Sequence, residues 1–422
     1  MDKFVINGGK KINGEITISG AKNASLALMP ASMLATGKSI LYNTPELNDV
    51  YTMIKLLNQL GVSSDFTNHK VELDTAGINS QFAPYEHVKK MRASVYVLGP
   101  LLTKFGYAKV SLPGGCAWGP RPVNLHLEGM KRLGADIELS EGYIVAKSKR
   151  LKGALISFDI PSVGATGNVL MAAVLAKGTT IINNAAMEPE ITNLAEYLIK
   201  MGAKIDGVNT ATLTVEGVDE LKPVEIETIP DRIEAGTLLV AAAITGGEIK
   251  IKNIPSKFIS HIISKLEDSG CSIISDNNGA MKLVKHSNQI KATDISTAVF
   301  PGFPTDMQAQ WIAYMSLAEG VATVKDNIYL DRFTHVPELQ RLGANIQVKE
   351  NTAIIQGVSK LTGAKVMSTD LRASASLVLA GLAAEGTTEV LRVYHLDRGY
   401  EKIEQKLTKL GADIQRIPGA EY

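Results

Sequence analysis

Two interleaved series of glycines divide the 422-residue chain into six similar parts. In the first series a helix-like run ends at a glycine, often in a Leu/Met-Gly-Ala context, and an apolar strand follows. Its members are Gly61, Gly134, Gly202, Gly270, Gly343 and Gly411. In the second series an Ala-rich apolar run precedes the glycine, as in LMAAVLAKGTTIINN. Its members are Gly37, Gly106, Gly178, Gly246, Gly320 and Gly386. A fixed period, here about 70 residues, is the signature of a repeat architecture, so the sequence predicts a six-fold repeat.

Each repeat is predicted to run strand, helix, strand, helix, strand, with a glycine just after each helix. The second helix is amphipathic, as in YEKIEQKLTKLG, whereas the first is apolar nearly all round, as in GNVLMAAVLAKG. A helix without a polar face is buried on every side. Six such helices predict helices inside and sheets outside, unlike a doubly wound fold. We expect two domains of three repeats, with a boundary near Pro230. The N-terminal GEITISG is a strand to which the sequence assigns no partner.

Composition excludes several classes of protein. A net charge of +1 gives no long-range attraction for nucleic acid or an acidic membrane, and 5% aromatic residues leave little for base stacking. No apolar run reaches the roughly 18 residues of a membrane span, and MDKFVINGGKK does not look like a signal peptide. Two distant cysteines suggest no disulfide framework, and no metal-ligand spacing occurs. We expect a cytoplasmic protein without a metal; its oligomeric state is not predicted.

Polar residues recur at the predicted starts of the apolar helices. The position 14 residues before each glycine of the second series is held by Asn23, Arg92, Gly164, Arg232, Asp306 and Arg372. Helix N-termini attract anions through free N–H groups and the macrodipole. The set, with Lys22, predicts a donor-rich cleft for anionic small molecules between the two domains. Alternatively, each arginine pairs with Asp231, Glu234 or Asp370, and for any single arginine both interpretations stay open.

One cysteine lies on a Gly/Pro-rich loop, SLPGGCAWGPRPV, just before a predicted helix start that carries Arg121. Arg121 and Arg398 each stand 13 residues before their closing glycine. A thiol near a helix N-terminus and an arginine has its thiolate favoured, so Cys116 is a candidate reactive group on a mobile loop. The alternative for Cys116 is a small buried hydrophobe, which fits Cys271 better. Trp118 is either a loop anchor or a substrate shelf.

Asp306 is open to two interpretations. A carboxylate in a cationic cleft serves as a general base toward a hydroxyl, but aspartate is also a common helix N-cap. Together with the cysteine loop, the residues indicate an enzyme that binds anionic small molecules.

Five long motifs carry a resemblance to a known family. They are SGAKNA at 19–24, LPGGCAWGPRPVNLH at 112–126, FPTDMQAQ at 303–310, TDLRASASLVLAG at 369–381 and HLDRGYEKI at 395–403. The chain resembles, end to end, the UDP-N-acetylglucosamine 1-carboxyvinyltransferases, a family of enolpyruvyl transferases. The resemblance implies a two-domain inside-out α/β barrel of six repeats. It also implies that residues 1–21 join the second domain, giving domains 22–229 and 1–21 with 230–422.

The resemblance implies transfer of the enolpyruvyl group of phosphoenolpyruvate to the 3′-hydroxyl of UDP-N-acetylglucosamine, without a cofactor. The reaction releases phosphate by addition and elimination through a tetrahedral ketal, and it is the first committed step of peptidoglycan synthesis. Cys116 corresponds to the proposed proton donor, which also forms a covalent phosphoenolpyruvate adduct and is the target of fosfomycin. By the same resemblance, Lys22 and Asn23 contact phosphoenolpyruvate, Arg92 binds a ligand, and Arg372 and Arg398 engage the carboxylate or phosphate. The uridine is held by Arg121, Pro122, Val123, Asn124 and Leu125. The sugar nucleotide is bound by Ser162, Val163 and Gly164, with Asp306 near the attacking hydroxyl and Ile328 as a backbone contact. Of these, Lys22, Cys116, Asp306 and Arg398 are the expected catalytic residues.

Two positions depart from the family pattern. Some members carry a lysine near Ile160, and others often carry an acid at Leu330. Neither change touches the reacting groups.

Three other classes of protein fit these residues less well. The nearest enzyme is 5-enolpyruvylshikimate-3-phosphate synthase, which shares the fold and donor but lacks the cysteine loop. A non-catalytic sensor of the sugar nucleotide would not need Lys22, Cys116, Asp306 and Arg398. A purely structural repeat protein would not need charges at the mouths of buried helices.

Overall fold

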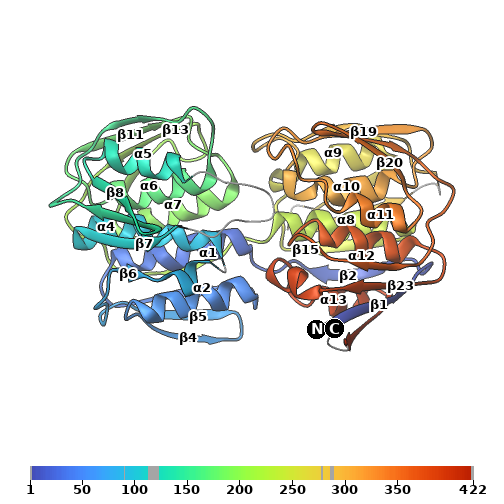
Figure 1. Cartoon of the computed structure of the whole chain (residues 1–422), viewed down its shortest axis with the longest axis horizontal. Helices are drawn as coiled ribbons and strands as arrows, with labels where there is room; N and C mark the ends of the chain where they lie inside the picture. Colours follow the sequence, from blue (N-terminus) through green and yellow to red (C-terminus); the bar gives the residue numbers. More distant parts are fainter. Residues whose placement is uncertain (1, 90, 113–122, 277–278, 286–288, 420–422) are drawn as a thin grey trace. The chain divides into compact units, whose positions relative to one another are not determined.

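The chain folds into two compact units, which the computed structural model describes for residues 2–89, 91–112, 123–276, 279–285 and 289–419. The continuous unit is Gly20–Ile229, and the discontinuous unit is Met1–Ser19 with Pro230–Tyr422 (Figure 1). Each unit has its own hydrophobic core. The sequence analysis begins the first domain at Lys22, two residues after the start of the continuous unit at Gly20. The domain limits 22–229 and 1–21 with 230–422 stay a prediction.

Helices fill the interior of both units. Those of the continuous unit are α1 (Lys22–Ala31), η1 (Ser32–Leu34), α2 (Asn48–Gln59), α3 (Tyr85–Val88), η2 (Arg92–Val97), α4 (Leu98–Phe105), α5 (Asn124–Arg132), α6 (Val163–Ala173) and α7 (Pro189–Met201). Those of the discontinuous unit are α8 (Arg232–Thr245), η3 (Ser256–Phe258), α9 (Ser260–Asp268), η4 (Thr305–Met307), α10 (Gln308–Met315), α11 (Val336–Arg341), α12 (Ser374–Ala383), η5 (Val393–Arg398) and α13 (Ile403–Lys409). In the latter unit α8, α10 and α12 pack against one another, with β19 drawn above them and β2 below them in the view of Figure 1.

The described strands form six four-stranded sheets, three in each unit. In the continuous unit the sheets are β14 (Glu225–Glu227), β3 (Lys38–Tyr42), β5 (Lys70–Asp74), β4 (Ser63–Thr67); β6 (Phe82–Ala83), β7 (Tyr107–Ser111), β9 (Tyr143–Lys147), β8 (Asp136–Ser140); and β10 (Leu155–Ser157), β11 (Thr179–Asn183), β13 (Thr212–Glu216), β12 (Lys204–Asp206). In the discontinuous unit they are β2 (Asn13–Thr17), β15 (Glu248–Lys252), β17 (Met281–Lys285), β16 (Cys271–Ser275); β18 (Ile295–Ser296), β19 (Val321–Lys325), β21 (Thr352–Gln356), β20 (Asn345–Lys349); and β22 (Lys365–Met367), β23 (Thr387–Leu391), β1 (Asp2–Asn7), β24 (Asp413–Pro418).

The repeat contains one more strand than the sequence predicts. The stretch from β10 to β13 runs β10, α6, β11, α7, β12, β13, so the second helix is followed by a hairpin rather than one strand. The hairpin is antiparallel, whereas the short leading strand β10 runs parallel to β11. The six-repeat inside-out α/β barrel is confirmed with this addition.

Three strands belong to sheets distant from them in the sequence. β2 precedes α1 but pairs in parallel with β15, so it is the first strand of the repeat that contains α8. β14 precedes α8 but pairs in parallel with β3, so it leads the sheet of the α1 repeat. These exchanged strands lie where the chain passes between the units. β1 supplies the strand that the last repeat lacks, between β23 and β24.

The glycine pattern is confirmed by the backbone. All twelve glycines of the two series have a positive φ, between 69° and 118°. Glycine adopts this conformation at little cost, so it ends a helix readily. The expected burial of the apolar helices is also confirmed, because α8 is buried from Ile233 to Ile244 and α12 from Ser374 to Leu382.

Candidate active site

Lys22 and Asn23 open α1 in the continuous unit. The Lys22 ammonium lies 3.6 Å from a carboxylate oxygen of Asp49 on α2, and the Lys22 side chain is 12% exposed. The first helix of this repeat therefore begins with a largely buried cation, one residue before the predicted position at Asn23.

Arg92 begins η2, and the segment 162–164 begins α6. Ser162 is the N-cap of α6, and its hydroxyl accepts a hydrogen bond from the Ala165 N–H at 3.3 Å. The Tyr96 hydroxyl donates to the carbonyl of Val163 at 3.3 Å. These bonds fix the first turn of α6, where Gly164 presents backbone rather than a side chain.

Asn124 and Leu125 are the first residues of α5, and Val123 is its N-cap. Cys116, Arg121 and Pro122 lie outside the described residues. Their predicted roles therefore rest on the sequence.

Asp306 lies in η4, at the start of the helical segment that continues as α10. One of its carboxylate oxygens accepts a hydrogen bond from Arg332 at 2.7 Å, and its side chain is 28% exposed. The same guanidinium lies 3.4 Å from Asp370, which is nearly buried. Burial would raise the pKa of Asp370, but the charge of Arg332 and the Ala373 N–H outweigh burial and hold the pKa below its usual range. Arg332 thus orients both carboxylates.

Arg372 is buried in this structure, with a side chain only 2% exposed. It lies two residues before α12, not at its first residue as the 14-residue spacing predicts. Its guanidinium donates to Asp231 at 2.6 Å and to the carbonyl of Gly399, and it stacks over the Tyr400 ring at 4.8 Å. Burial would raise the pKa of Asp231, but the charge and hydrogen bond of Arg372 hold it below its usual value. Of the two interpretations of this arginine, pairing with Asp231 is the one seen.

Arg398 ends η5 rather than beginning α13, because α13 starts five residues later at Ile403. The spacing rule therefore misplaces the helix start here. Burial, and then the charge of Arg398, lower the pKa of His395 on the same turn.

Ile328 lies in a tight turn held by one aspartate. Asp326 accepts hydrogen bonds from the N–H groups of Ile328 at 2.9 Å and Tyr329 at 3.0 Å. Because the Ile328 N–H is already bonded, the carbonyl is the better backbone group for a ligand.

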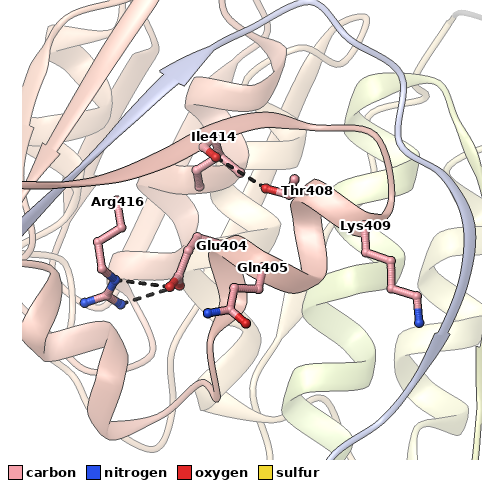
Figure 2. Close-up of a pocket in the computed structure, with 6 residues that line it drawn as sticks. All are labelled: Glu404, Gln405, Thr408, Lys409, Ile414 and Arg416. Atoms are coloured by element: carbon pink, nitrogen blue, oxygen red, sulfur yellow. Dashed lines mark hydrogen bonds and ion pairs between the residues drawn. The ribbon is translucent and has the colours of Figure 1, made fainter.

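A pocket elsewhere in the discontinuous unit involves none of the predicted site residues. Figure 2 shows its lining, which comes from α13 and β24: Glu404, Gln405, Thr408, Lys409, Ile414 and Arg416. Arg416 bonds Glu404 at 3.1 Å and also Asp397, so its charge is balanced by protein carboxylates. We therefore do not assign this pocket to the active site.

In the ranges that the structure describes, no three His, Cys, Asp or Glu side chains gather to hold a metal ion. Within the same ranges no helix has the length and hydropathy to cross a bilayer.

Comparison with known proteins decides the family. The model of the EPSP synthase (3-phosphoshikimate 1-carboxyvinyltransferase) family matches residues 6–407. A UDP-N-acetylglucosamine 1-carboxyvinyltransferase of Chloroherpeton thalassium is 58% identical over 99% of this chain and 97% of its own length. Namesakes from Geotalea daltonii and Myxococcus xanthus are 54% and 52% identical, over 99% of this chain and 100% and 99% of their own lengths. This chain belongs to the UDP-N-acetylglucosamine 1-carboxyvinyltransferase family.

Solved structures confirm the fold of this UDP-N-acetylglucosamine 1-carboxyvinyltransferase family member. The enolpyruvyl transferase NikO from Streptomyces tendae superposes with a TM-score of 0.88 at 23% identity, covering 98% of both chains. EPSP synthase from Acinetobacter baumannii superposes with a TM-score of 0.77 at 17% identity, covering 99% of this chain and 100% of its own. At these identities the likeness shows the fold alone, and the fold is the enolpyruvyl transferase barrel.

The sequence reasoning missed two residues at the site of this family member. Arg332 does not stand at a predicted helix start, so the 14-residue spacing does not identify it, although it orients Asp306. His126 follows the predicted uridine segment directly, but one buried histidine has no signature in a sequence. Only its contacts with α6 reveal it.

Proposed function

We propose that this chain is an enolpyruvyl transferase that uses phosphoenolpyruvate as donor and the 3′-hydroxyl of UDP-N-acetylglucosamine as acceptor. The observation that carries the proposal is the full-length identity of 52–58% with relatives named for this activity. The reaction belongs to the first committed step of peptidoglycan synthesis, and we place it in the cytoplasm.

The reaction has two steps. The 3′-oxygen bonds to C2 of phosphoenolpyruvate while the hydroxyl proton leaves to a base and an acid protonates C3. A proton then leaves C3, the C2=C3 double bond forms again and the C2–O bond to phosphate breaks. Asp306 is the proposed base and Cys116 the proposed acid. The 2.7 Å bond from Arg332 supports the first assignment, because it holds the Asp306 carboxylate in one orientation.

Cations near the helix starts, together with Arg398 at the end of η5, are proposed to neutralise the substrates. Phosphoenolpyruvate and the diphosphate carry several negative charges, which Lys22, Arg92, Arg121 and Arg398 are proposed to bind. Arg372 was also assigned to the ligand from the resemblance. In this structure Arg372 bonds Asp231 and the carbonyl of Gly399, next to Arg398. Arg372 would therefore bind a ligand only after its bond to Asp231 breaks.

The sugar nucleotide is proposed to lie along the starts of two helices. Val123, Asn124 and Leu125, with Arg121 and Pro122, contact the uridine. Ser162, Val163 and Gly164 offer the first turn of α6 to the diphosphate, because free N–H groups at a helix start favour anions. Asp306 and Ile328 are proposed to complete the contacts with the sugar nucleotide, whereas Asn23, next to Lys22, is proposed to contact phosphoenolpyruvate.

Phosphate release from phosphoenolpyruvate tests the proposal. Release that depends on UDP-N-acetylglucosamine supports it. Release that depends on shikimate 3-phosphate would identify the rival synthase, and binding of the sugar nucleotide without release would identify a sensor. Asp306→Asn should abolish most of the release, whereas Asp268→Asn, on an exposed face of α9, is the matched control.

A further inference from the structure

His126 joins the starts of three helical segments in the continuous unit. It is the third residue of α5 and is only 8% exposed. Its Nδ1 lies 3.1 Å from the amide nitrogen of Asn168 on α6. Its Nε2 lies against Gly164, since a Cβ built there would approach Nε2 to 3.0 Å. Arg92, from η2, is close enough to act electrostatically on the ring.

The hydrogen-bond network assigns the tautomer of His126. The Asn168 Oδ1 accepts the Gly99 N–H at 2.7 Å, and Nδ2 donates to the Val95 carbonyl at 2.8 Å. A flipped amide would set Nδ2 against the Gly99 N–H, so this orientation is fixed. The second hydrogen of Nδ2 therefore points to His126 Nδ1, which must be unprotonated. A neutral ring then carries its proton on Nε2, beside Gly164.

The ring is neutral under working conditions. Burial, and to a lesser extent the charge of Arg92, lower the pKa of His126 to about 4. The packed helix α6 carries no ionisable side chain from Val163 to Ala173, so it supplies no carboxylate to oppose this. A neutral histidine beside Arg92 adds no positive charge, and its hydrogen bond with Asn168 and its close approach to Gly164 tie the start of α5 to α6.

We propose that His126, as the Nε2–H tautomer bonded to Asn168, is a positioning residue for the sugar nucleotide. It fixes the start of α5 against the start of α6 and η2. The segments 124–125 and 162–164 and the Arg92 side chain then form one preorganised surface, which lowers the ordering cost of binding. This inference rests on the proposed function, and it adds a residue that never needs to touch the reacting atoms.

Nuclear magnetic resonance tests the geometry without any activity. Histidine-selective ¹⁵N labelling reports the tautomer of each ring, and His126→Leu assigns the signal by its disappearance. We expect Nε2–H and no titration from pH 5.5 to 8.5. A proton on Nδ1, or a titration near the reference pKa of roughly 6.5, would overturn the inference.

Two substitutions separate positioning from bulk packing. In His126→Asn the Oδ1 atom reaches the place of Nδ1 and still accepts from Asn168, whereas His126→Leu has no acceptor. We expect His126→Leu to raise the KM for UDP-N-acetylglucosamine, and the Kd of UDP alone, by about tenfold. The KM for phosphoenolpyruvate should change less than about twofold. His126→Asn should keep most of the wild-type affinity that His126→Leu loses. The control is His261→Asn, which changes an exposed histidine.

Gly164→Ala perturbs the same contact from the other side. The Cβ added at position 164 would lie 3.0 Å from Nε2 and 3.1 Å from Cε1 of His126. Neither of these two ring atoms is present in His126→Asn. Gly164→Ala should therefore weaken UDP binding several-fold in the wild-type background and much less in the His126→Asn background. Equal effects in both backgrounds, or loss of affinity for both substrates alike in His126→Leu, would refute the inference. Failure of the proposed function would appear separately, as wild-type protein that releases no phosphate.

Discussion

Replacing Asp231 by asparagine removes a buried charge while keeping the shape of the side chain. One oxygen of Asp231 caps α8 by accepting the N–H groups of Ile233 at 2.8 Å and Glu234 at 3.0 Å. The other accepts from Arg372 at 2.6 Å. Asparagine keeps the cap, because it ranks with aspartate at this position, but its amide group faces the guanidinium with hydrogens.

The expected loss follows from burial. The side chains of Arg372 and Asp231 are 2% and 6% exposed, so water screens the pair very little. Removing one partner of a buried pair costs about 3–5 kcal/mol. Arg372 keeps the Gly399 carbonyl and the Tyr400 ring, so we expect Asp231→Asn near the lower limit, about 3 kcal/mol. Asp231→Ala also loses the cap and should cost about 4 kcal/mol.

Urea unfolding followed by circular dichroism measures these changes, with hydrogen exchange of α8 peptides as a local readout. Asp219→Asn, which breaks an exposed pair with Arg150, is the matched control and should change little. The double variant Asp231→Asn/Arg372→Met should recover part of the loss, because no unpaired charge stays buried. A loss below about 1 kcal/mol for Asp231→Asn would refute the reasoning.

The pH dependence gives a second check on the same pair. The pKa of Asp231 is lower in the folded than in the unfolded protein, because Arg372 outweighs the effect of burial. Its stabilisation is therefore present above the unfolded pKa of about 3.9 and is lost as pH falls through the lower folded pKa. The difference between wild type and Asp231→Asn should be constant from about pH 8 to pH 5 and shrink below about pH 4.

Three further predictions concern the site and the chain crossing. Arg332→Met should lower kcat by about 10- to 100-fold with a smaller change in either KM, because Asp306 loses its 2.7 Å bond; steady-state kinetics measures this, and unchanged kcat would contradict the orienting role. Gly20→Ala should destabilise the protein by at least about 2 kcal/mol in thermal unfolding, since its Cβ would lie 1.6 Å from the Asn43 carbonyl oxygen; a wild-type melting temperature would disprove that contact. Cys116→Asp should keep some turnover but resist fosfomycin in a time-dependent inactivation assay, because a carboxylic acid still donates a proton but is not alkylated in the same way; inactivation of this variant would reject the assigned target.

The positions of helices could be predicted because their signals are local. Gly246 follows an apolar run and takes a φ of 69°, and the slot rule places Arg232 at the first residue of α8. The related 13-residue spacing fails at Arg398, which ends a 3₁₀ segment, because local spacing does not distinguish a 3₁₀ turn from the helix after it. The second strand of the hairpin is absent from the predicted repeat, although its residues alternate between buried and less buried positions, as in Thr212–Glu216, which is the pattern of a half-buried strand.

By itself the sequence determined the repeat number, the buried helices and the residues at their starts, because backbone conformation and apolar patterning act over a few residues. Tertiary structure decided the partners. β2 and β14 exchange sheets, and Arg372 finds Asp231 across 141 positions of the chain. It also gave His126 its contact with Asn168, 42 positions away. Such partners depend on which surfaces meet once both cores are packed, and no short window of sequence holds that information.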